Sequence, residues 1–388
     1  MNDFNLLLYL QKNRPKKYLN TNLKKSIIPN MNKIAVVGAG ISGLSMANYL
    51  EKYNIDYHIY ERRNKEDLAG HGFLIPQEGV EYLTQIIDPD LLFKHGSFLK
   101  KYIQYSHTGK KIAEKDLNNV FAISRYSLIQ LLSEKISPEK ITYNATVAPS
   151  ETEKGKLKYS DGTDLDAEIT IVSDGSRSRI RRNLFKDEKM RQVRENEVVN
   201  IIKNEEIAAS VENDFMKFHH DQGGLTFGIL KLSHDTVLWY SQFDNEKYKI
   251  NECTPDNLKK YMLEVFADWH PLVTSIIEKS GYENVHLWCV YELEELNPFY
   301  KDNTVFIGDA AHPLIPFTSQ GVTSALKDSH ILTKYLVEEP TITDAFHKYE
   351  AERKPEIETH INNGRILLNQ FLLPTDQQTD NILPISYK

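Results

Sequence analysis

The clearest candidate for chemistry in this sequence is an acidic residue placed between a strand and a stiff loop. In the stretch FIGDAAHPLIPFTSQG, an apolar run ends at Gly308 and Asp309, and small residues and prolines follow. A carboxylate at a strand end can accept hydrogen bonds from ligand hydroxyls, and the rigid backbone after it can lie flat against a large ring. A helix predicted to begin at Gly321 and Val322 would point its positive end at that ring.

A second candidate is the glycine-rich turn in KIAVVGAGISGLSMANYLEKYN, which predicts a strand, a tight turn and a helix. Gly38, Gly40 and Gly43 form the pattern GxGxxG. The first glycine makes the turn, the second lets a pyrophosphate approach the backbone, and the third lets the helix pack on the strand. The next predicted strand, YHIY, ends at Glu61, where an acid is expected to bind a ribose. Together these features predict dinucleotide binding.

The two candidates together favour FAD over a nicotinamide dinucleotide. FAD is the longer molecule, and the hydroxyls of its ribityl chain need an acceptor, which is the role expected for Asp309. The isoalloxazine ring would then lie against the loop after Asp309 and the helix that starts at Gly321. We find a single GxGxxG in the sequence, and therefore no sign of a separate nicotinamide domain.

With these motifs in place, the sequence resembles the class A FAD-dependent monooxygenases, the para-hydroxybenzoate hydroxylase-like aromatic hydroxylases. GAGISG with Glu61, IVSDGSRSRIRR and GDAAHPLIPFTSQG are similar to three family motifs and occur in the family's order. FAISRYSLIQLLSE places Arg125 where the family has a cofactor-contacting arginine, and AFHKYEAERKP resembles the closing helix. The likeness covers roughly residues 31–360, and some stretches, such as FADWHPLVTSII, also resemble the tetracycline-inactivating branch.

The motifs and the resemblance together assign a set of cofactor-binding residues. Pro316 is also expected to pack beside the reactive ring edge, although it could simply stiffen its loop. Asp174 could lie near the pyrophosphate or could cap the following helix. It is preceded by Ser173, where the family has Ala or Gly. The cofactor-binding set is Gly38, Ala39, Gly40, Ser42, Gly43, Glu61, Arg62, Arg125, Asp174, Gly308, Asp309, Pro316, Gly321 and Val322.

The resemblance implies an enzyme that hydroxylates an aromatic or polycyclic small molecule. NADPH or NADH would reduce the flavin as a transient reductant, oxygen would form a C4a-hydroperoxide, and its distal oxygen would pass to the substrate. Two alternatives stay open: an oxidase or reductase without oxygen insertion, and a flavin-binding redox regulator without turnover. A halogenase is disfavoured, because HLWCVYEL does not match the halogenase Trp-x-Trp signature.

The expected fold class is α/β: a doubly wound, Rossmann-like FAD-binding domain, an inserted antiparallel-sheet substrate domain and a long C-terminal helix. Alternating stretches such as GGLTFGILKLS predict the antiparallel strands. Residues before Met31 read as a disordered basic extension or a misassigned start. The expected division is 1–30 for that extension, 31–184 for the first part of the FAD domain with a substrate-side excursion near 95–115, 185–295 for the substrate domain, 296–340 for the second FAD part, and 341–388 for the C-terminal helix and tail.

Composition narrows the possible partners and location of the protein. A net charge of -7 gives no general attraction to nucleic acid. Two cysteines suit a reducing, cytoplasmic location, and no run is apolar enough to span a membrane. No metal site is expected, because His219 and His220 are adjacent and would point to opposite faces of a strand. The expected partner is a small aromatic substrate, and the protein could be a monomer or a homodimer.

Overall fold

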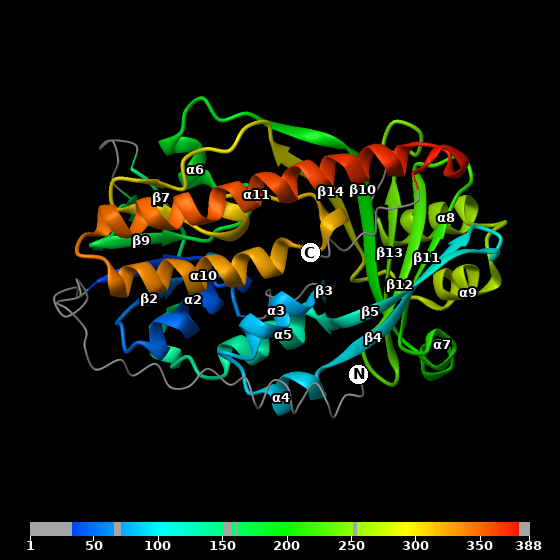
Figure 1. Cartoon of the computed structure of the whole chain (residues 1–388), viewed down its shortest axis with the longest axis horizontal. Helices are drawn as coiled ribbons and strands as arrows, with labels where there is room; N and C mark the ends of the chain where they lie inside the picture. Colours follow the sequence, from blue (N-terminus) through cyan, green and yellow to red (C-terminus); the bar gives the residue numbers. More distant parts are fainter. Residues whose placement is uncertain (1–32, 66–70, 151–156, 160, 251–253, 380–388) are drawn as a thin grey trace.

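The computed structural model describes residues 33–65, 71–150, 157–159, 161–250 and 254–379, which form two sheets joined by a long helix (Figure 1). The predicted basic extension, residues 1–30, lies outside the described residues. Helices gather around the first sheet, and the second sheet stands beside it with its own helices on the far side. This arrangement confirms the α/β fold class.

The first sheet is a parallel sheet buried on both faces. Among the described residues its strand order is β15-β16-β9-β1-β2-β6, and all neighbours are parallel except β15 and β16. Every residue of β1, β9 and β16 is buried, as expected for the continuous apolar runs of a sheet covered by helices. Its strands are β1 (Ile34–Val37), β2 (His58–Tyr60), β6 (Ile141–Thr142), β9 (Ile169–Val172), β15 (Tyr300–Lys301) and β16 (Thr304–Phe306).

Helices on both sides of this sheet complete its core. α2 follows the glycine-rich turn and lies side by side with α10 (Figure 1). Leu44, Leu50 and Leu332 are fully buried between these elements. The helices are α2 (Ile41–Lys52), α3 (Gln77–Leu83), α4 (Pro89–Lys94), α5 (Arg125–Ser133), α6 (Arg179–Leu184) and α10 (Gly321–Glu338).

The second sheet has the strand order β14-β10-β13-β12-β11-β4-β5-β3 among the described residues. Its neighbours pair antiparallel, except β11 and β4, which run parallel. The strands are β3 (Gly72–Ile75), β4 (Gly96–Ser106), β5 (Lys111–Ser124), β10 (Met190–Lys203), β11 (Asp214–His219), β12 (Leu225–Lys231), β13 (Thr236–Phe243) and β14 (His286–Leu293). An N-terminal segment of three strands, residues 72–124, therefore joins the strands of the inserted region. The domain limits drawn from the sequence stay predictions.

The two faces of the second sheet differ in chemistry. On one face Phe227, Trp239 and Phe243 are fully buried beneath three helices. The other face carries alternate residues of the same strands, including Lys217 and Gln242, and it turns toward the loop after Asp309. The covering helices are α7 (Glu205–Val211), α8 (Pro255–Val265) and α9 (Pro271–Lys279).

The C-terminal helix α11 (Ile342–Leu372) joins the two sheets, as the sequence predicted. Near one end, the Tyr349 hydroxyl donates to the Phe306 carbonyl of β16 at 3.0 Å. At the other end, the Gly224 amide beside β12 donates to the Phe371 carbonyl at 2.6 Å. A small hairpin of β7 (Val147–Pro149) and β8 (Leu157–Tyr159) lies apart from both sheets. Among the described residues, no helix is both long and apolar enough to cross a membrane.

Candidate functional site

The candidate site forms where four parallel strands end. β2, β1, β9 and β16 are consecutive neighbours in the first sheet, so their carboxyl ends share one edge. Directly after these strands come Glu61, the glycine-rich turn, Asp174 and Asp309. In open parallel sheets this edge is where ligands bind. The fold therefore gathers three sequence motifs that are far apart in the chain.

Two glycines of the turn are required by close packing. Gly38 has φ +107°, and a Cβ there would lie 2.5 Å from the Ser173 carbonyl oxygen. A Cβ on Gly43 would lie 1.9 Å from the Gly38 carbonyl oxygen. Any side chain at either position would collide with backbone, so these residues hold the turn, β9 and α2 together.

Two other glycines face open space. A Cβ on Gly40 or on Gly321 would meet no atom of the described chain within 4 Å. Gly40 has φ -78°, and Gly321 is a helical residue without positive φ, so backbone conformation does not require glycine at either position. The open face of Gly40 is what a pyrophosphate needs for its approach to the turn. The open face of Gly321 lies at the start of α10, where the sequence predicted contact with the flavin ring.

Glu61 and Ser173 fix the shape of the glycine-rich turn. The Glu61 carboxylate accepts from the Ala39 amide at 2.7 Å and from the Arg63 amide at 2.9 Å. The Ser173 hydroxyl lies 2.9 Å from the Val37 carbonyl and 3.1 Å from that of Gly38. The serine that departs from the family pattern thus hydrogen-bonds the backbone of the turn.

Asp174 holds an unpaired carboxylate oxygen in the same region. Its Oδ1 is buried and has no hydrogen-bond partner among the described residues. Burial raises the pKa of Asp174, and Ser178, Arg181 and Arg62 offset part of that rise. The side chain that caps α6 is Ser178, which accepts from the Arg181 amide at 3.0 Å. The capping role considered for Asp174 is therefore wrong.

Asp309 and Arg125 come together from distant segments. The Asp309 side chain reaches solvent, yet desolvation by the protein around it raises the pKa of Asp309, and His312, Arg125 and Arg181 offset part of that rise. Burial lowers the pKa of Arg125, and the like charge of Arg63 lowers it further, while Asp309 and Glu61 act in the opposite direction. Half-buried Arg125 and exposed Arg63 are neighbouring cations, and two like charges this close favour an anionic ligand such as a pyrophosphate.

The remaining predicted residues lie around this edge. Gly308 has φ +56°, and a Cβ there would lie 2.1 Å from the Ser42 hydroxyl. Pro316 is exposed in the short helix η5 (Pro316–Thr318), Val322 is buried in α10, and Arg62 is exposed. The residues at this edge fit a dinucleotide, because they combine open-faced glycines, a cationic pair and the unpaired Oδ1 of Asp174.

The motif IVSDGSRSRIRR contains four arginines to which the sequence alone assigned no role, and one of them, Arg181, has a structural role at this edge. Arg179 and Arg182 are exposed, but the Arg181 side chain is 1% exposed. Its guanidinium donates to the carbonyls of Asp309 at 3.2 Å and Ala310 at 2.8 Å. Its Nε pairs with Glu188 at 2.6 Å. The sequence offered one sign of this burial: Arg181 lies near the start of the helix, next to apolar Ile180 and three residues after Ser178, which caps the helix.

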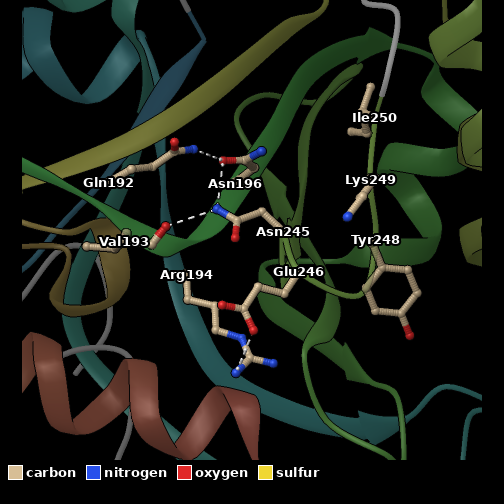
Figure 2. A pocket seen from close by; sticks show the side chains of 9 residues that line it. All are labelled: Gln192, Val193, Arg194, Asn196, Asn245, Glu246, Tyr248, Lys249 and Ile250. Carbon is tan, nitrogen blue, oxygen red and sulfur yellow. Dashed lines mark hydrogen bonds and ion pairs between the residues drawn. The ribbon is translucent and has the colours of Figure 1, made fainter.

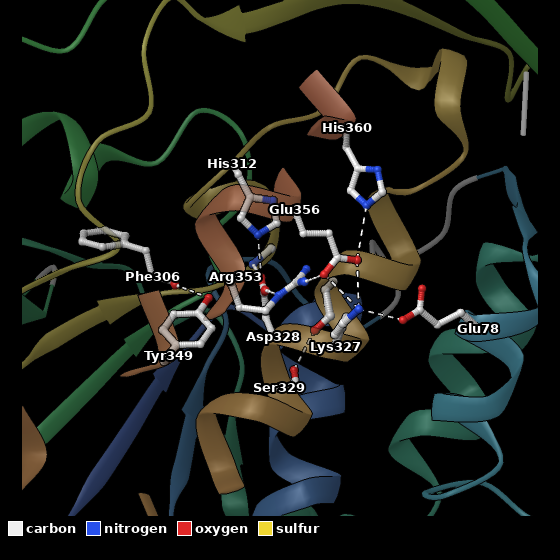
Figure 3. A network of polar contacts seen from close by, with 12 residues as sticks. Glu78, Phe306, His312, Lys327, Asp328, Ser329, Tyr349, Arg353, Glu356 and His360 are labelled. Atoms are coloured by element: carbon white, nitrogen blue, oxygen red, sulfur yellow. Dashed lines mark hydrogen bonds and ion pairs between the residues drawn. The ribbon is translucent and has the colours of Figure 1, made fainter. Parts of the chain in front are cut away.

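A buried polar network behind Asp309 was also missed (Figure 3). Asp328 of α10 accepts from the Gly308 amide at 2.7 Å, from His312 Nε2 at 2.6 Å and from Arg353 Nε at 2.7 Å. Burial alone would raise the pKa of Asp328, but His312 and Arg353 outweigh it and lower that pKa. The network extends through Glu356 to Lys327 and so connects α10 with α11.

The pocket in Figure 2 lies elsewhere, between the start of β10 and the segment after β13. It encloses about 460 Å³ and is mostly polar, with Arg194 bound to Asp244 through two contacts of 2.8 Å. None of the predicted cofactor residues lines it. In the part of the chain that the structure describes, no group of three or more His, Cys, Asp or Glu side chains could hold a metal ion.

Comparisons with known proteins agree with this geometry. The family model described as FAD binding domain matches residues 31–363. The 6-hydroxynicotinate 3-monooxygenase of Pseudomonas fluorescens is 26% identical over 83% of this chain and 87% of its own length. The structure of HpxO from Klebsiella pneumoniae with FAD and uric acid has a TM-score of 0.80 at 19% identity, over 89% of this chain and 90% of that one. Tetracycline destructase Tet(55) has a TM-score of 0.72 at 18% identity, over 90% and 92%.

The two structural likenesses show the fold, while the family match includes the glycine-rich turn, Asp174 and Asp309. The predicted family and cofactor are thereby confirmed. The chain belongs to the FAD-binding-domain family and is an FAD-dependent monooxygenase.

Proposed function

We propose that the protein inserts one oxygen atom into a small, planar aromatic substrate held between the flavin and the second sheet. The observation that supports this most directly is the shared strand edge that carries Gly40 and Asp309, together with the η5 loop directly before Gly321, which faces Lys217 of the second sheet. The relative from Pseudomonas fluorescens is named for 6-hydroxynicotinate, and the HpxO structure contains uric acid, and both compounds are of this kind. We further propose that the protein works in the cytoplasm as a monomer or homodimer, with NAD(P)H as reductant.

The bound FAD would supply the chemistry, carrying electrons from NAD(P)H to molecular oxygen. The chain's residues bind and orient it. We assign the pyrophosphate to the turn at Gly40 and to the cationic pair of Arg63 and Arg125. Gly40 precedes α2 and Arg125 begins α5, so amides at helix N-termini are available at both places, and Arg63 adds a neighbouring positive charge. Glu61 would accept from the ribose and Asp309 from the ribityl chain.

The loop before α10 has a different task. η5 and the start of α10 would lie against the isoalloxazine, with Pro316 beside its reactive edge. The α10 N-terminus at Gly321 and Val322 favours negative charge on the ring. The second sheet covers the opposite side of this space and excludes water, which strengthens each electrostatic contact within it.

The test begins with protein reconstituted with FAD. Phenols, hydroxypyridines and quinolones are screened for stimulated oxidation of NADPH or NADH, and products are analysed by mass spectrometry under ¹⁸O₂. A product that gains one labelled oxygen atom supports the proposal. Stimulated NAD(P)H oxidation that yields only hydrogen peroxide, across the whole panel, would contradict oxygen insertion and favour an oxidase.

A further inference from the structure

The face of the second sheet that turns toward the η5 loop carries a buried polar cluster that the FAD site does not use. Its members come from β10, β11 and β13. Glu197 of β10 lies opposite Gln242 of β13, and Lys217 of β11 lies opposite Gly228 of the intervening strand β12. Lys217 is 5% exposed and Gln242 is 2% exposed. We call Glu195, Glu197, Lys217 and Gln242 the sheet cluster.

Lys217 occupies a fixed position within the sheet cluster. Its Nζ donates to the Gln242 amide oxygen at 2.8 Å. The same Nζ lies 5.6 Å from the centre of the Tyr240 ring and 5.9 Å from that of Phe317. Phe317 belongs to η5 and follows Pro316 directly, so the sheet cluster faces the loop expected to hold the flavin ring.

The sheet cluster contains a carboxyl group without a hydrogen-bond partner among the described residues. Glu195 is completely buried, and neither of its oxygens has a hydrogen-bond partner among the described residues. An unpaired buried carboxylate costs free energy, so its presence calls for an explanation outside ordinary packing. Glu197, two residues along the same face, is only partly buried, so it can reach a ligand while Glu195 lies behind it.

The charged groups of the sheet cluster shift one another's pKa values. Burial raises the pKa of Glu195 well above its ordinary value, and Glu197 raises it further, while Lys217 and Gln242 offset part of the rise. Burial also raises the pKa of Glu197, against the opposing effect of Lys217. The larger rise favours a proton on Glu195, while the Lys217 ammonium favours the charged form of Glu197.

An exposed aromatic side chain lies beside Glu197. Trp288 of the edge strand β14 is paired with Glu197 and therefore points to the same face of the sheet. It is 48% exposed, which is unusual for so large an apolar side chain. A planar ring stacked on Trp288 would place a polar edge within reach of Glu197.

We propose that Glu197, supported by Glu195 and Lys217, selects substrates whose aromatic ring carries an O–H or N–H donor, and that Trp288 stacks on that ring. The inference rests on the proposed function, and it names the substrate class of the same site. Glu197 contacts the substrate, whereas Glu195 and Lys217 are positioning residues that keep one carboxylate charged. A substrate that turned a carboxylate toward this cluster would meet repulsion instead.

The experiment compares donor probes with methylated counterparts on FAD-loaded protein. The probes are 2-quinolone against N-methyl-2-quinolone, and 1-naphthol against 1-methoxynaphthalene. Binding is measured from the change in oxidised flavin absorption, which needs no turnover. We expect each donor probe to bind about 10- to 100-fold more tightly than its methylated partner, as for a hydrogen bond to a charged group.

Variants assign the preference to residues. Glu197→Leu should bring the donor preference to about one, because the acceptor is gone. Glu195→Gln should reduce the preference partly, and it should alter how the preference depends on pH, which a merely structural role would leave unchanged. Trp288→Ala should weaken both members of each pair alike. Glu264→Gln, on the outer helix α8, is the matched control and should change nothing.

The outcomes separate this inference from the proposed function. Equal binding of donor and methylated probes, an unchanged preference in Glu197→Leu, or no binding of either donor probe would overturn the inference. Each result stands apart from product analysis, because labelled oxygen in a product would still support the monooxygenase. Conversely, a Glu197-dependent preference without oxygen insertion would uphold the inference and contradict the proposed chemistry.

Discussion

Arg353 of α11 and Asp328 of α10 form a completely buried ion pair, with 2.7 Å between Nε and Oδ1. The other oxygen of Asp328 accepts from the Gly308 amide, directly before Asp309. The pair therefore connects the C-terminal helix with the residue expected to hold the ribityl chain. Its geometry makes the flavin site depend on a contact that does not touch the flavin.

Asp328→Ala should destabilise the protein and weaken FAD binding together. Removing Asp328 leaves the buried Arg353 guanidinium with Glu356 as its remaining ion-pair partner among the described residues and leaves His312 without its carboxylate, and breaking such a buried pair costs about 3–5 kcal/mol. Chemical denaturation measures the loss, and fluorescence titration measures FAD affinity. Lys279→Ala breaks an exposed pair with Glu206 and serves as control, with an expected change below about 1 kcal/mol. Equal effects of the two substitutions would refute the coupling.

Gly40→Val and Gly43→Ala should separate cofactor approach from packing. A side chain at position 40 enters open space, so the apoprotein should keep its stability while FAD affinity falls at least about tenfold. A methyl group at position 43 meets backbone at 1.9 Å, so the apoprotein itself should be destabilised. Thermal unfolding of both apoproteins, with FAD titration, checks this. Undiminished FAD affinity in Gly40→Val would remove the pyrophosphate assignment.

Asp309→Ala should cost FAD affinity with little cost in stability. Its side chain reaches solvent and makes no hydrogen bond within the described structure. The contact with Arg181 is made by the Asp309 backbone carbonyl, which the substitution keeps. The apoprotein should therefore change by less than about 0.5 kcal/mol. The flavin content of the purified variant is read from its visible absorption. A variant as yellow as the parent would count against the ribityl role.

The sheet cluster should make stability depend on pH. Because the pKa of Glu197 is raised in the fold, its stabilising contribution is complete below the unfolded pKa, about 4.3, and is lost as pH rises through the folded value. Glu195, Lys217 and Tyr240 are the titratable groups that act with it. Between pH 5 and pH 8 the Tm of the parent should therefore fall relative to that of Glu197→Gln. Parallel Tm curves would contradict this.

The flavin site could be predicted from the sequence where chemistry is local. Gly38, Gly40 and Glu61 lie in one strand-turn-helix-strand unit, and their spacing alone indicates a dinucleotide, although it does not distinguish FAD from a nicotinamide dinucleotide. Asp309 could be added because a buried strand precedes it. The predicted helix after Gly321 and the long C-terminal helix were also correct.

Features that depend on distant pairing could not be predicted. The parallel contact of β4 with β11 joins segments over 100 residues apart, and no local pattern indicates it. Glu195 and Glu197 alternate along β10 in a way that is typical of a solvent-exposed face, but the η5 loop covers that face in the folded protein. Arg181 is buried only because its helix packs against the turn at Asp309.

The continuous course of α11 sets a strict limit on insertions. Tyr349 contacts β16 of the first sheet and Phe371 contacts Gly224 beside β12 of the second, both from the same continuous helix. Each residue added between them would turn everything beyond it by about 100°. With one extra residue between them, either Tyr349 or Phe371 would point away from its contact and into water. Only an added length close to whole turns keeps both anchors facing inward, and it would still slide one sheet past the other. The length of α11 therefore fixes how far the two sheets stand from each other.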